Sequence, residues 1–337
     1  MSNLENRRVI LSARPVGVPG PEYFALETVA VEDLNEGEFL VHNSFLSVDP
    51  AMRGWVNDAP NYLPPVPVGD VMRAFSVGEI IASNHPEYQV GETVAGLFGW
   101  QRYAISNGDN VMRKVIDTDL SISLALGVLG LNGITAYFGL LDVCNPQPGE
   151  TVVVSTAAGA VGSCVGQIAK TLGCRTVGIT GGPAKVQQCL EEFGYDQAID
   201  YKNSKDISEE VRNYCPDGVN VYFDNTCGPI SDAVFENLAL GARITVCGTS
   251  SIQEWAPLPV GPRVHRQLMV NRARMTGFLV LDYKQRYLEA IEPLANWVRS
   301  GAISIREHVL DGMEDAPGAL QMLYQGKNKG KLLIKVD

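Results

Sequence analysis

The feature that most constrains the fold is the stretch of residues 151–185, which reads TVVVSTAAGAVGSCVGQIAKTLGCRTVGITGGPAK. Its two β-branched apolar runs, Thr151–Ser155 and Arg175–Thr180, are typical of strands that are buried on both faces. Between them lie a turn of small residues, Thr156–Gly162, and a segment with helical spacing, Ser163–Leu172. The stretch therefore predicts a βαβ unit whose first turn lies where a dinucleotide pyrophosphate binds a helix N-terminus.

The glycine pattern of this turn falls short of the usual one. Dinucleotide-binding turns carry G-x-G-x-x-G, whereas Thr156, Gly159 and Gly162 give only T-x-x-G-x-x-G. A tight turn that packs a helix onto a sheet can look the same, so the glycines alone are weak evidence. The order of strand, turn, helix and second strand favours the dinucleotide interpretation.

The end of the second strand indicates which dinucleotide is bound. NAD-dependent enzymes place Asp or Glu about 20 residues after the glycines to hold the ribose 2′-hydroxyl. Here the chain reads Thr180-Gly181-Gly182, and Lys185 follows. The missing acid removes repulsion against a 2′-phosphate, and the lysine supplies a counter-charge. We therefore predict NADP(H); the alternative is that Lys185 is a solvated residue of a first helical turn.

Length and composition exclude several classes of protein. The 337 residues are enough for two domains, and the net charge of −11 argues against a general nucleic-acid binder. No apolar run reaches the 18 residues of a membrane span, and the first residues, MSNLENRRVILSARP, lack the apolar core of a signal peptide. We expect a cytoplasmic protein that acts on a small molecule.

The seven cysteines and four histidines show no metal-binding spacing. No two cysteines form C-x-x-C, which indicates reduced cytosolic thiols rather than a disulfide framework or a zinc cluster. The histidines are expected to be surface or structural residues. We therefore predict no zinc.

The hydrophobic period changes once along the chain. Residues 1–125 are mostly β, whereas strands and helices alternate from 126 onward and give six strands, the size of a complete doubly wound dinucleotide domain. The chain end returns to strand, helix and strand. We predict an α/β protein with a doubly wound parallel sheet over 126–299, inserted in a mostly β domain of 1–125 plus 300–337. The helices expected on the boundaries of this inserted domain are Leu126–Leu141 and Tyr283–Arg299.

Seven blocks in order over nearly the whole chain carry a family resemblance. They read SVDPAMRGWVN, NHPEYQVGETV, GWQRYAIS, LNGITAYFGLLDV, PGETVVVSTAAGAVGSCVGQIAKTLGC, FDNTCG and GKNKGKLLI. Together they resemble the zinc-independent medium-chain dehydrogenases/reductases, and within them the NADPH-dependent alkenal/one double-bond reductases, which include prostaglandin, plant alkenal and bacterial curcumin reductases. The resemblance implies a GroES-like substrate domain split by a Rossmann domain, an active site in the cleft between them, and a homodimer.

The resemblance also implies the reaction. NADPH would reduce the C=C bond of an α,β-unsaturated ketone or aldehyde by hydride transfer to the β-carbon, and the enolate would then be protonated at the α-carbon. The protein need only position the reactants and polarise the carbonyl, so no metal is required.

The matching positions receive cofactor contacts by resemblance. Several have a plain structural alternative: a core tyrosine at a strand end, an Asn turn cap, apolar core residues, or a basic turn in GKNKGK. The implied contacts are Gly159, Ala160, Val161 and Gly162 at the pyrophosphate; Lys185 and Tyr201 at the 2′-phosphate; Phe278 and Leu279 at the nicotinamide carboxamide; and Thr135, Gly181, Asn225, Cys247, Thr249 and Asn328 elsewhere on the cofactor.

Two departures from the family pattern leave the proton donor open. Family members carry a tyrosine in the loop after the fifth strand, where this chain reads CGTSSIQEWAPLP, with Gln253 and Trp255 instead. Their DPYMRG block is DPAMRG here, so Ala51 replaces a second aromatic. The remaining phenol is Tyr62 in the proline-rich loop 57–69, and a phenol with a pKa of about 10 can donate to a developing enolate at neutral pH. Tyr62 is the predicted catalytic residue; its alternatives are a packing role, with the nicotinamide ribose hydroxyl or a water as donor.

Two other functions stay open at this point. A quinone oxidoreductase of the same superfamily would share the fold and the cofactor, and a non-catalytic protein could keep NADPH only as a stabilising ligand. A zinc alcohol dehydrogenase is disfavoured because its zinc ligands have no counterpart in the sequence. The physiological substrate and the stereochemistry of the reduction cannot be read from the residues.

Overall fold

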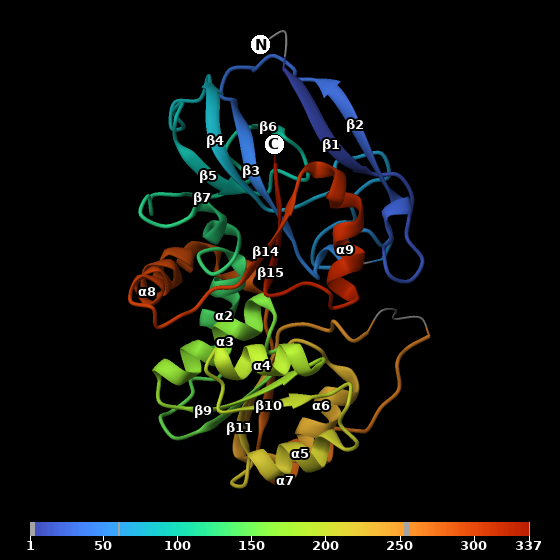
Figure 1. Ribbon diagram of the computed structural model, residues 1–337, viewed down its shortest axis with the longest axis vertical. Helices are drawn as coiled ribbons and strands as arrows, with labels where there is room; N and C mark the ends of the chain where they lie inside the picture. Colours follow the sequence, from blue (N-terminus) through green and yellow to red (C-terminus); the bar gives the residue numbers. More distant parts are fainter. Residues whose placement is uncertain (1–3, 60, 253–256, 337) are drawn as a thin grey trace. The chain divides into compact units, whose positions relative to one another are not determined.

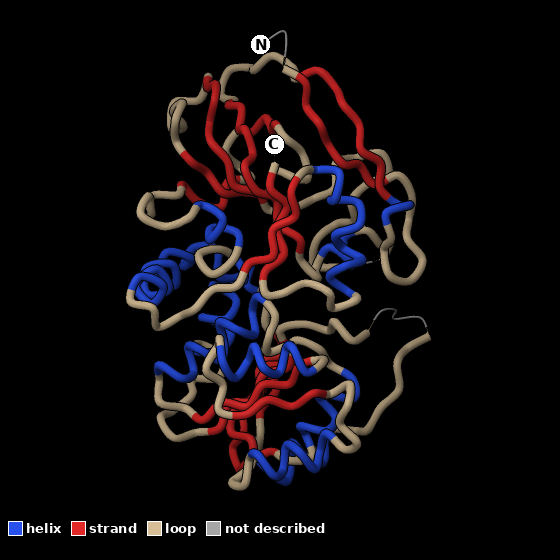
Figure 2. The backbone as a smooth tube through the Cα atoms, in the orientation of Figure 1, coloured by secondary structure: helices blue, strands red, loops and turns tan. Residues whose placement is uncertain are grey.

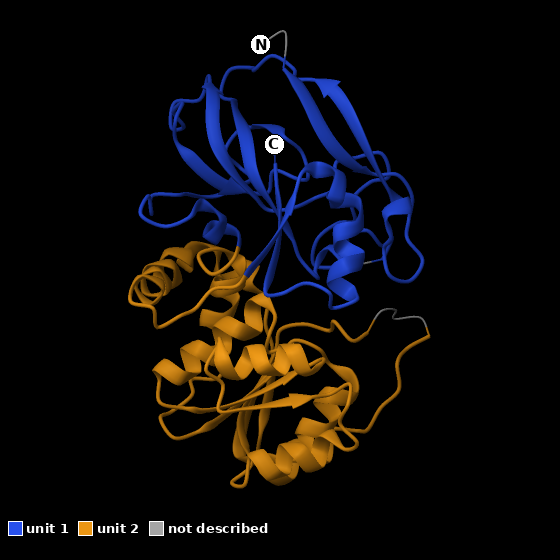
Figure 3. Ribbon diagram, in the orientation of Figure 1, with its two compact units in different colours: residues 1–126, 307–337 blue, residues 127–306 orange. Residues whose placement is uncertain are grey.

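The structure is a computed structural model that describes residues 4–59, 61–252 and 257–336. The chain divides into two compact units (Figure 3): unit 1 is Met1–Leu126 with Glu307–Asp337, and unit 2 is Gly127–Arg306. The chain thus leaves unit 1 near the expected residue 126 and returns to it at Glu307 rather than at 300.

Unit 2 is built on a six-stranded sheet in the order β10-β9-β8-β11-β12-β13. All five pairs of neighbouring strands are parallel. Numbered from β8, this is the order 3-2-1-4-5-6 of a doubly wound dinucleotide-binding sheet, in which ligands bind at the carboxyl ends of the strands where the order reverses. That point lies between β8 and β11. All residues of β8 are buried, as the β-branched run predicts for a strand covered on both faces.

Helices cover both faces of this sheet (Figure 1), with α3 and α4 on one face and α5 and α7 on the other. The second face forms a cluster of buried apolar residues that includes Val153, Ile199, Tyr222 and Ile244 from the strands and Val211 from α5. The strands of unit 2 are β8 Thr151–Ser155, β9 Arg175–Thr180, β10 Gln197–Asp200, β11 Val219–Asp224, β12 Leu238–Val246 and β13 Arg274–Gly277. Its helices are α2 Leu131–Leu141, α3 Ala160–Thr171, α4 Pro183–Glu191, α5 Ile207–Tyr214, α6 Gly228–Phe235, α7 His265–Asn271 and α8 Tyr287–Arg299.

Unit 1 is mostly β (Figure 2), with a β1-β2 hairpin and a seven-stranded sheet in the order β14-β15-β3-β4-β5-β7, in which β6 also pairs with β3. The C-terminal strand β15 runs antiparallel to β3, so the end of the chain completes a sheet begun by its first segment. The strands are β1 Glu5–Leu11, β2 Phe24–Ala30, β3 Phe39–Val48, β4 Ser76–Ser83, β5 Thr93–Gly96, β6 Tyr103–Ser106, β7 Val111–Lys114, β14 Glu307–Asp311 and β15 Lys331–Lys335, and the helices are α1 Met52–Trp55 and α9 Ala316–Tyr324.

Two helices begin later than the sequence predicts. The helix expected from Leu126 starts at Leu131, because the segment before it contains Gly127 and Gly130, and glycine is a poor helix former. The helix expected from Tyr283 starts at Tyr287, since the four preceding residues belong to a 3₁₀ segment, Val280–Arg286. Within the described residues, no helix is long and apolar enough to cross a membrane.

Candidate functional site

The turn between β8 and α3 is tighter than its single-letter pattern suggests. Thr156 has a positive φ of 54°, and its carbonyl accepts a hydrogen bond from the Gly159 N–H at 2.8 Å. A Cβ at Gly162 would lie 2.3 Å from the Thr156 carbonyl oxygen, and one at Gly159 would lie 2.9 Å from the Thr156 methyl group. Both glycines are therefore required by close approach, and the turn fits the pyrophosphate cradle expected at the start of α3.

The carboxyl ends of β9 and β10 bring the expected 2′-phosphate residues together. The Tyr201 N–H donates to the Thr180 carbonyl at 3.0 Å, which fixes the end of β10 beside that of β9. A Cβ at Gly181 would lie 2.9 Å from the Tyr201 ring, so the tyrosine covers this glycine. Lys185, in the first turn of α4, is half-buried, and burial lowers the pKa of its ammonium group, as does the nearby charge of Lys202.

Asp200, the last residue of β10, ties these two strand ends together. Its Oδ1 accepts from the Gly182 N–H at 2.7 Å and from the Lys202 N–H at 3.1 Å, and its Oδ2 accepts from Asn203 at 2.7 Å. Burial alone would raise the pKa of this carboxyl, but hydrogen bonds from Gly182, Asn203 and Lys202 lower it overall. The carboxylate therefore points at backbone and amide donors and holds the turn before α4 in place.

The turn after β11 is organised by a buried carboxylate that the sequence does not single out. Asp224 is 2% exposed and accepts from the Ser231 hydroxyl at 2.7 Å and from the backbone N–H groups of Thr226 and Cys227, both at 2.9 Å. Its neighbour Asn225 donates from its side chain to the Ser155 carbonyl at 2.8 Å. The predicted Asn225 thus lies at the point where the strand order reverses, and it bridges the ends of β8 and β11.

The remaining predicted residues of unit 2 come from three segments: the chain after β12, the chain after β13, and α2. The Cys247 N–H donates to the Asp224 carbonyl at 2.8 Å, and burial raises the pKa of the Cys247 thiol to about 12, so it stays protonated. Phe278 and Leu279 directly follow β13, and the Phe278 N–H donates to the Val246 carbonyl at 3.1 Å. Thr249 follows β12 and is half-buried, whereas Thr135 is a buried residue of α2.

Tyr62 and Asn328 belong to unit 1. Tyr62 is 47% exposed, and its N–H donates to the Asn61 side chain at 2.8 Å. Its neighbour Tyr324 donates to the Pro50 carbonyl at 2.8 Å, and burial raises the pKa of Tyr324 to about 12. Asn328 is buried and donates within its own turn, to the Gly330 carbonyl at 2.8 Å.

Three further features bear on the predictions. Ala51 packs against the main apolar core of unit 1, whereas Gln253 and Trp255 lie outside the described residues.

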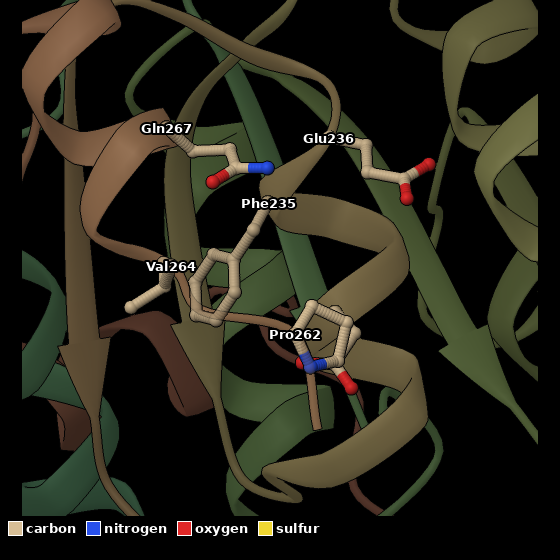
Figure 4. Close-up of a pocket in the computed structure, with 6 residues that line it drawn as sticks. Phe235, Glu236, Pro262, Val264 and Gln267 are labelled. Atoms are coloured by element: carbon tan, nitrogen blue, oxygen red, sulfur yellow. The ribbon is translucent and has the colours of Figure 1, made fainter.

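A small pocket of unit 2 lies between α6 and the start of α7 (Figure 4), and none of the predicted site residues lines it. Its lining residues are Asp232, Phe235, Glu236, Pro262, Val264 and Gln267. Among the described residues, no group of three or more His, Cys, Asp or Glu side chains could hold a metal ion.

Comparison with known proteins identifies the family. Two family models match, described as the N-terminal domain of oxidoreductase over residues 7–114 and as zinc-binding dehydrogenase over residues 160–296. The NADPH-dependent curcumin reductase of Escherichia coli (strain K12) is 43% identical, and the alignment covers 98% of this chain and 97% of that protein. The chain is a medium-chain dehydrogenase/reductase. Within that family it stands in the alkenal/one double-bond reductase group.

Two further relatives of this medium-chain dehydrogenase/reductase are similar over their whole length. The NADP(+)-dependent 2-alkenal reductase of Nicotiana tabacum is 37% identical, and the alignment covers 99% of this chain and 98% of that protein. The crystal structure of CurA from Vibrio vulnificus in complex with NADPH has a TM-score of 0.92 and 42% identity, and covers 98% of this chain and 99% of that one.

Sequence reasoning on this medium-chain dehydrogenase/reductase missed Asp200, Lys202 and Asp224. Asp200 and Lys202 flank the predicted Tyr201 in the block IDYK, and that adjacency is the one signal that could have found them. Asp224 precedes the predicted Asn225 in FDNTCG, but a carboxylate that organises backbone N–H groups leaves no spacing pattern.

Proposed function

We propose that this enzyme uses NADPH to reduce the carbon–carbon double bond of α,β-unsaturated ketones and aldehydes. The observation that supports NADPH is the grouping of Gly181, Lys185 and Tyr201 at the ends of β9 and β10. The carboxylate at this place, Asp200, is hydrogen-bonded to backbone and amide donors. The substrate class is supported by two relatives, whose names specify curcumin and 2-alkenal as substrates.

The residues of unit 2 would hold NADPH by its polar groups. Gly159 and Gly162 allow the pyrophosphate to approach the N–H groups at the start of α3, which have no partner within the helix. Lys185 and Tyr201 would bind the 2′-phosphate by charge and by hydrogen bonding. The backbone after β13, at Phe278 and Leu279, would bind the carboxamide. When bound, NADPH supplies the hydride.

Tyr62 would donate a hydrogen bond to the substrate carbonyl and stabilise the enolate oxygen. A phenol is protonated at neutral pH, so it can donate without first being charged. Its partial exposure leaves it accessible to a small molecule. A hydrogen-bond donor held in this position would stabilise the negative charge that develops on the oxygen in the transition state.

The experiment that tests the function compares acceptors and donors side by side. Purified protein is assayed with trans-2-alkenals, benzalacetone, cyclic enones and a quinone, each with NADPH and with NADH. We expect NADPH oxidation with enals and enones to exceed that with the quinone, and NADPH to be preferred over NADH. Faster quinone reduction would favour a quinone oxidoreductase, and tight NADPH binding without turnover would favour a non-catalytic protein.

The proposal includes a cytoplasmic homodimer. The edge strand β13 supports dimerisation, because it pairs only with β12 among the described strands. All four of its residues are exposed, including the apolar Met275 at 43%. An unpaired edge strand can pair with an identical strand of another chain. Light scattering in solution tests this, and a mass equal to that of one chain would contradict it.

A further inference from the structure

The second lysine at the strand ends of unit 2, Lys202, has no role in the function described so far. A Cβ at Gly181 would lie 3.0 Å from Lys202 Cε, the atom that carries the ammonium group, and 2.9 Å from the Tyr201 ring. The Lys202 side chain therefore extends over the end of β9 and lies beside Tyr201. This is the position at which a dinucleotide-binding sheet meets the adenosine ribose.

Lys202 and Lys185 form a like-charge pair. They come from different turns, and they are close enough that the charge of Lys202 lowers the pKa of Lys185 in addition to the effect of burial. Neither ammonium group forms an ion pair with a carboxylate anywhere in the described parts of the chain. The N-terminus of α4, which begins at Pro183, adds partial positive charge to the same place.

This arrangement of charges favours a bound anion. Two ammonium groups repel each other, and neither is neutralised by the protein. A phosphate monoester carries about −1.5 to −2 charges at pH 7 and three acceptor oxygens, so it can satisfy both lysines at once. A ribose hydroxyl carries no charge and leaves the repulsion in place.

Asp200 links the two turns that carry these lysines. Its Oδ1 accepts from the N–H of Gly182, which caps α4, and from the N–H of Lys202 itself. One carboxylate oxygen thus joins the turn that carries Lys185 to the turn that carries Lys202. Because its oxygens are hydrogen-bonded to these donors and to Asn203, the carboxylate stabilises the two turns while the ammonium groups stay available.

We infer that Lys202 is a second specificity-determining residue for the cofactor, which binds the 2′-phosphate together with Lys185, and that Asp200 is the positioning residue for this pair. The inference rests on the proposed function, in that NADPH is the cofactor. It adds a residue and a mechanism: the selection of a phosphorylated ribose by two lysines whose turns are joined through one carboxylate.

The test measures binding by calorimetry in the full-length protein, with NADP⁺ and NAD⁺ as separate ligands. We expect Lys202→Gln to weaken NADP⁺ binding at least tenfold and to change NAD⁺ binding less than twofold. Lys185→Gln is the reference for a residue already placed at the phosphate. Lys205→Gln is the matched control, because Lys205 is an exposed lysine three positions away that lines a different groove.

Asp200 is tested by two variants that differ in hydrogen bonding. Asp200→Asn keeps an acceptor for Gly182 and Lys202, so it should retain the preference for NADP⁺ over NAD⁺. Asp200→Ala removes the acceptor and should reduce that preference at least threefold. Loss of the fold would weaken the binding of NADP⁺ and NAD⁺ equally. The ratio of the two affinities therefore distinguishes a positioning role from general destabilisation.

The possible failures are distinguishable. If the unaltered protein shows no preference for NADP⁺, the proposed cofactor is wrong. If it prefers NADP⁺ but Lys202→Gln shifts the preference no more than Lys205→Gln does, Lys202 has no role at the phosphate and the inference is wrong while the proposed function stands. If Asp200→Ala leaves the preference unchanged, the positioning role is wrong.

Discussion

Cys227 has a backbone conformation that glycine adopts far more readily than any other residue. Its φ is 61° and its ψ is −172°, in a region that is costly for a side chain with a Cβ. The conformation is held from both sides, because the Cys227 N–H donates to Asp224 at 2.9 Å and its carbonyl accepts from the Ser251 hydroxyl at 3.0 Å. The strain thus lies in the turn that positions Asn225.

Replacing Cys227 by glycine should therefore stabilise the protein. We expect Cys227→Gly to raise the free energy of unfolding by about 1 kcal/mol, the net of relieved strain and the greater entropy of glycine in the unfolded chain. Cys227→Ala is the control, since it removes the thiol and keeps the strain. Urea unfolding of both variants measures the difference, and an equal gain in both would show that the thiol, not the backbone, is responsible.

Tyr62→Phe tests the predicted donor. Removing the hydroxyl should lower kcat for an enone at least tenfold, because loss of one oxyanion donor typically costs about 10²–10³ in kcat. The variant should fold normally, because the side chain is 47% exposed. Steady-state kinetics with benzalacetone provide the measurement.

The control for Tyr62 is a second phenol of unit 1. Tyr103 lies in β6 and stacks on His42 with ring centroids 4.9 Å apart, so Tyr103→Phe removes a hydroxyl from a half-buried tyrosine outside the proline-rich loop. We expect its kcat to be unchanged. An unchanged kcat in Tyr62→Phe as well would remove Tyr62 from the mechanism and leave the ribose hydroxyl or a water as the donor.

At the scale of single residues, sequence reasoning could reach the positions that match a motif and no others. Gly159, Gly162 and Lys185 have neighbours in the chain that define their predicted roles. The role that we propose for Lys202 depends on its closeness to Gly181, in a different turn, and only the folded sheet places these two residues together.

At the scale of elements, a pair of glycine-to-alanine substitutions should have opposite effects. A Cβ at Gly162 would lie 2.3 Å from the Thr156 carbonyl oxygen, so Gly162→Ala must displace the turn at the start of α3. At Gly318, in the first turn of α9, a Cβ would meet nothing within 4 Å. Alanine is the better helix former there, by up to about 1 kcal/mol.

We therefore expect Gly162→Ala to lower both the melting temperature and the affinity for NADPH, the latter at least tenfold. Gly318→Ala should raise the melting temperature by a few degrees, roughly what 1 kcal/mol produces in a chain of this size, and should leave NADPH binding unchanged. Thermal unfolding and fluorescence titration measure the two effects. A Gly162→Ala variant that binds NADPH normally would show that the turn can relax and that its tightness is not required.

The bounds of an element were predicted most accurately where the element is most deeply buried. The strands Thr151–Ser155 and Arg175–Thr180 were predicted with their observed bounds, because a strand buried on both faces has an uninterrupted apolar run. The helix starts near 131 and 287 were not, since glycines and a 3₁₀ segment change the local backbone without changing the apolar period. The hydrophobic pattern specifies which side chains are buried, but it does not specify the residue at which a helix begins or ends.

At the scale of the whole molecule, the insertion of one unit into the other could be predicted because the apolar period changes from strand-like to alternating. The residue at which the chain returns could not, since unit 1 resumes at Glu307 rather than at 300. Ser123, close to the end of the first segment of unit 1, donates to Glu307, the first residue of its second segment, at 2.8 Å. This hydrogen bond joins two parts of the chain that are far apart in sequence and that carry no shared motif.

Glu307 makes the stability of the molecule dependent on pH. Burial raises the pKa of its carboxyl, although the Ser123 hydrogen bond and the charge of Lys331 act in the opposite direction. Its second oxygen, Oε1, is buried with no hydrogen-bond partner in the described structure. A carboxyl whose pKa is raised by folding favours the protonated state, so its contribution to stability is present at acid pH and is lost as the pH rises through the folded-state pKa.

Glu307→Gln should therefore be more stable than the unaltered protein at pH 8, by about 1 kcal/mol, the scale of one unsatisfied buried acceptor. The gain should shrink as the pH falls toward the unfolded pKa of about 4.3, where the glutamate is protonated and, like the glutamine, neutral.

Glu289→Gln is the control of opposite sign. Arg286 lowers the pKa of the exposed Glu289 carboxyl by hydrogen bonding, so removing this carboxylate should cost a little stability at pH 8. Urea unfolding at pH 5 and pH 8 measures both variants. A Glu307→Gln protein that is less stable than the parent at pH 8 would mean that the ionised carboxylate stabilises the junction between the two segments of unit 1.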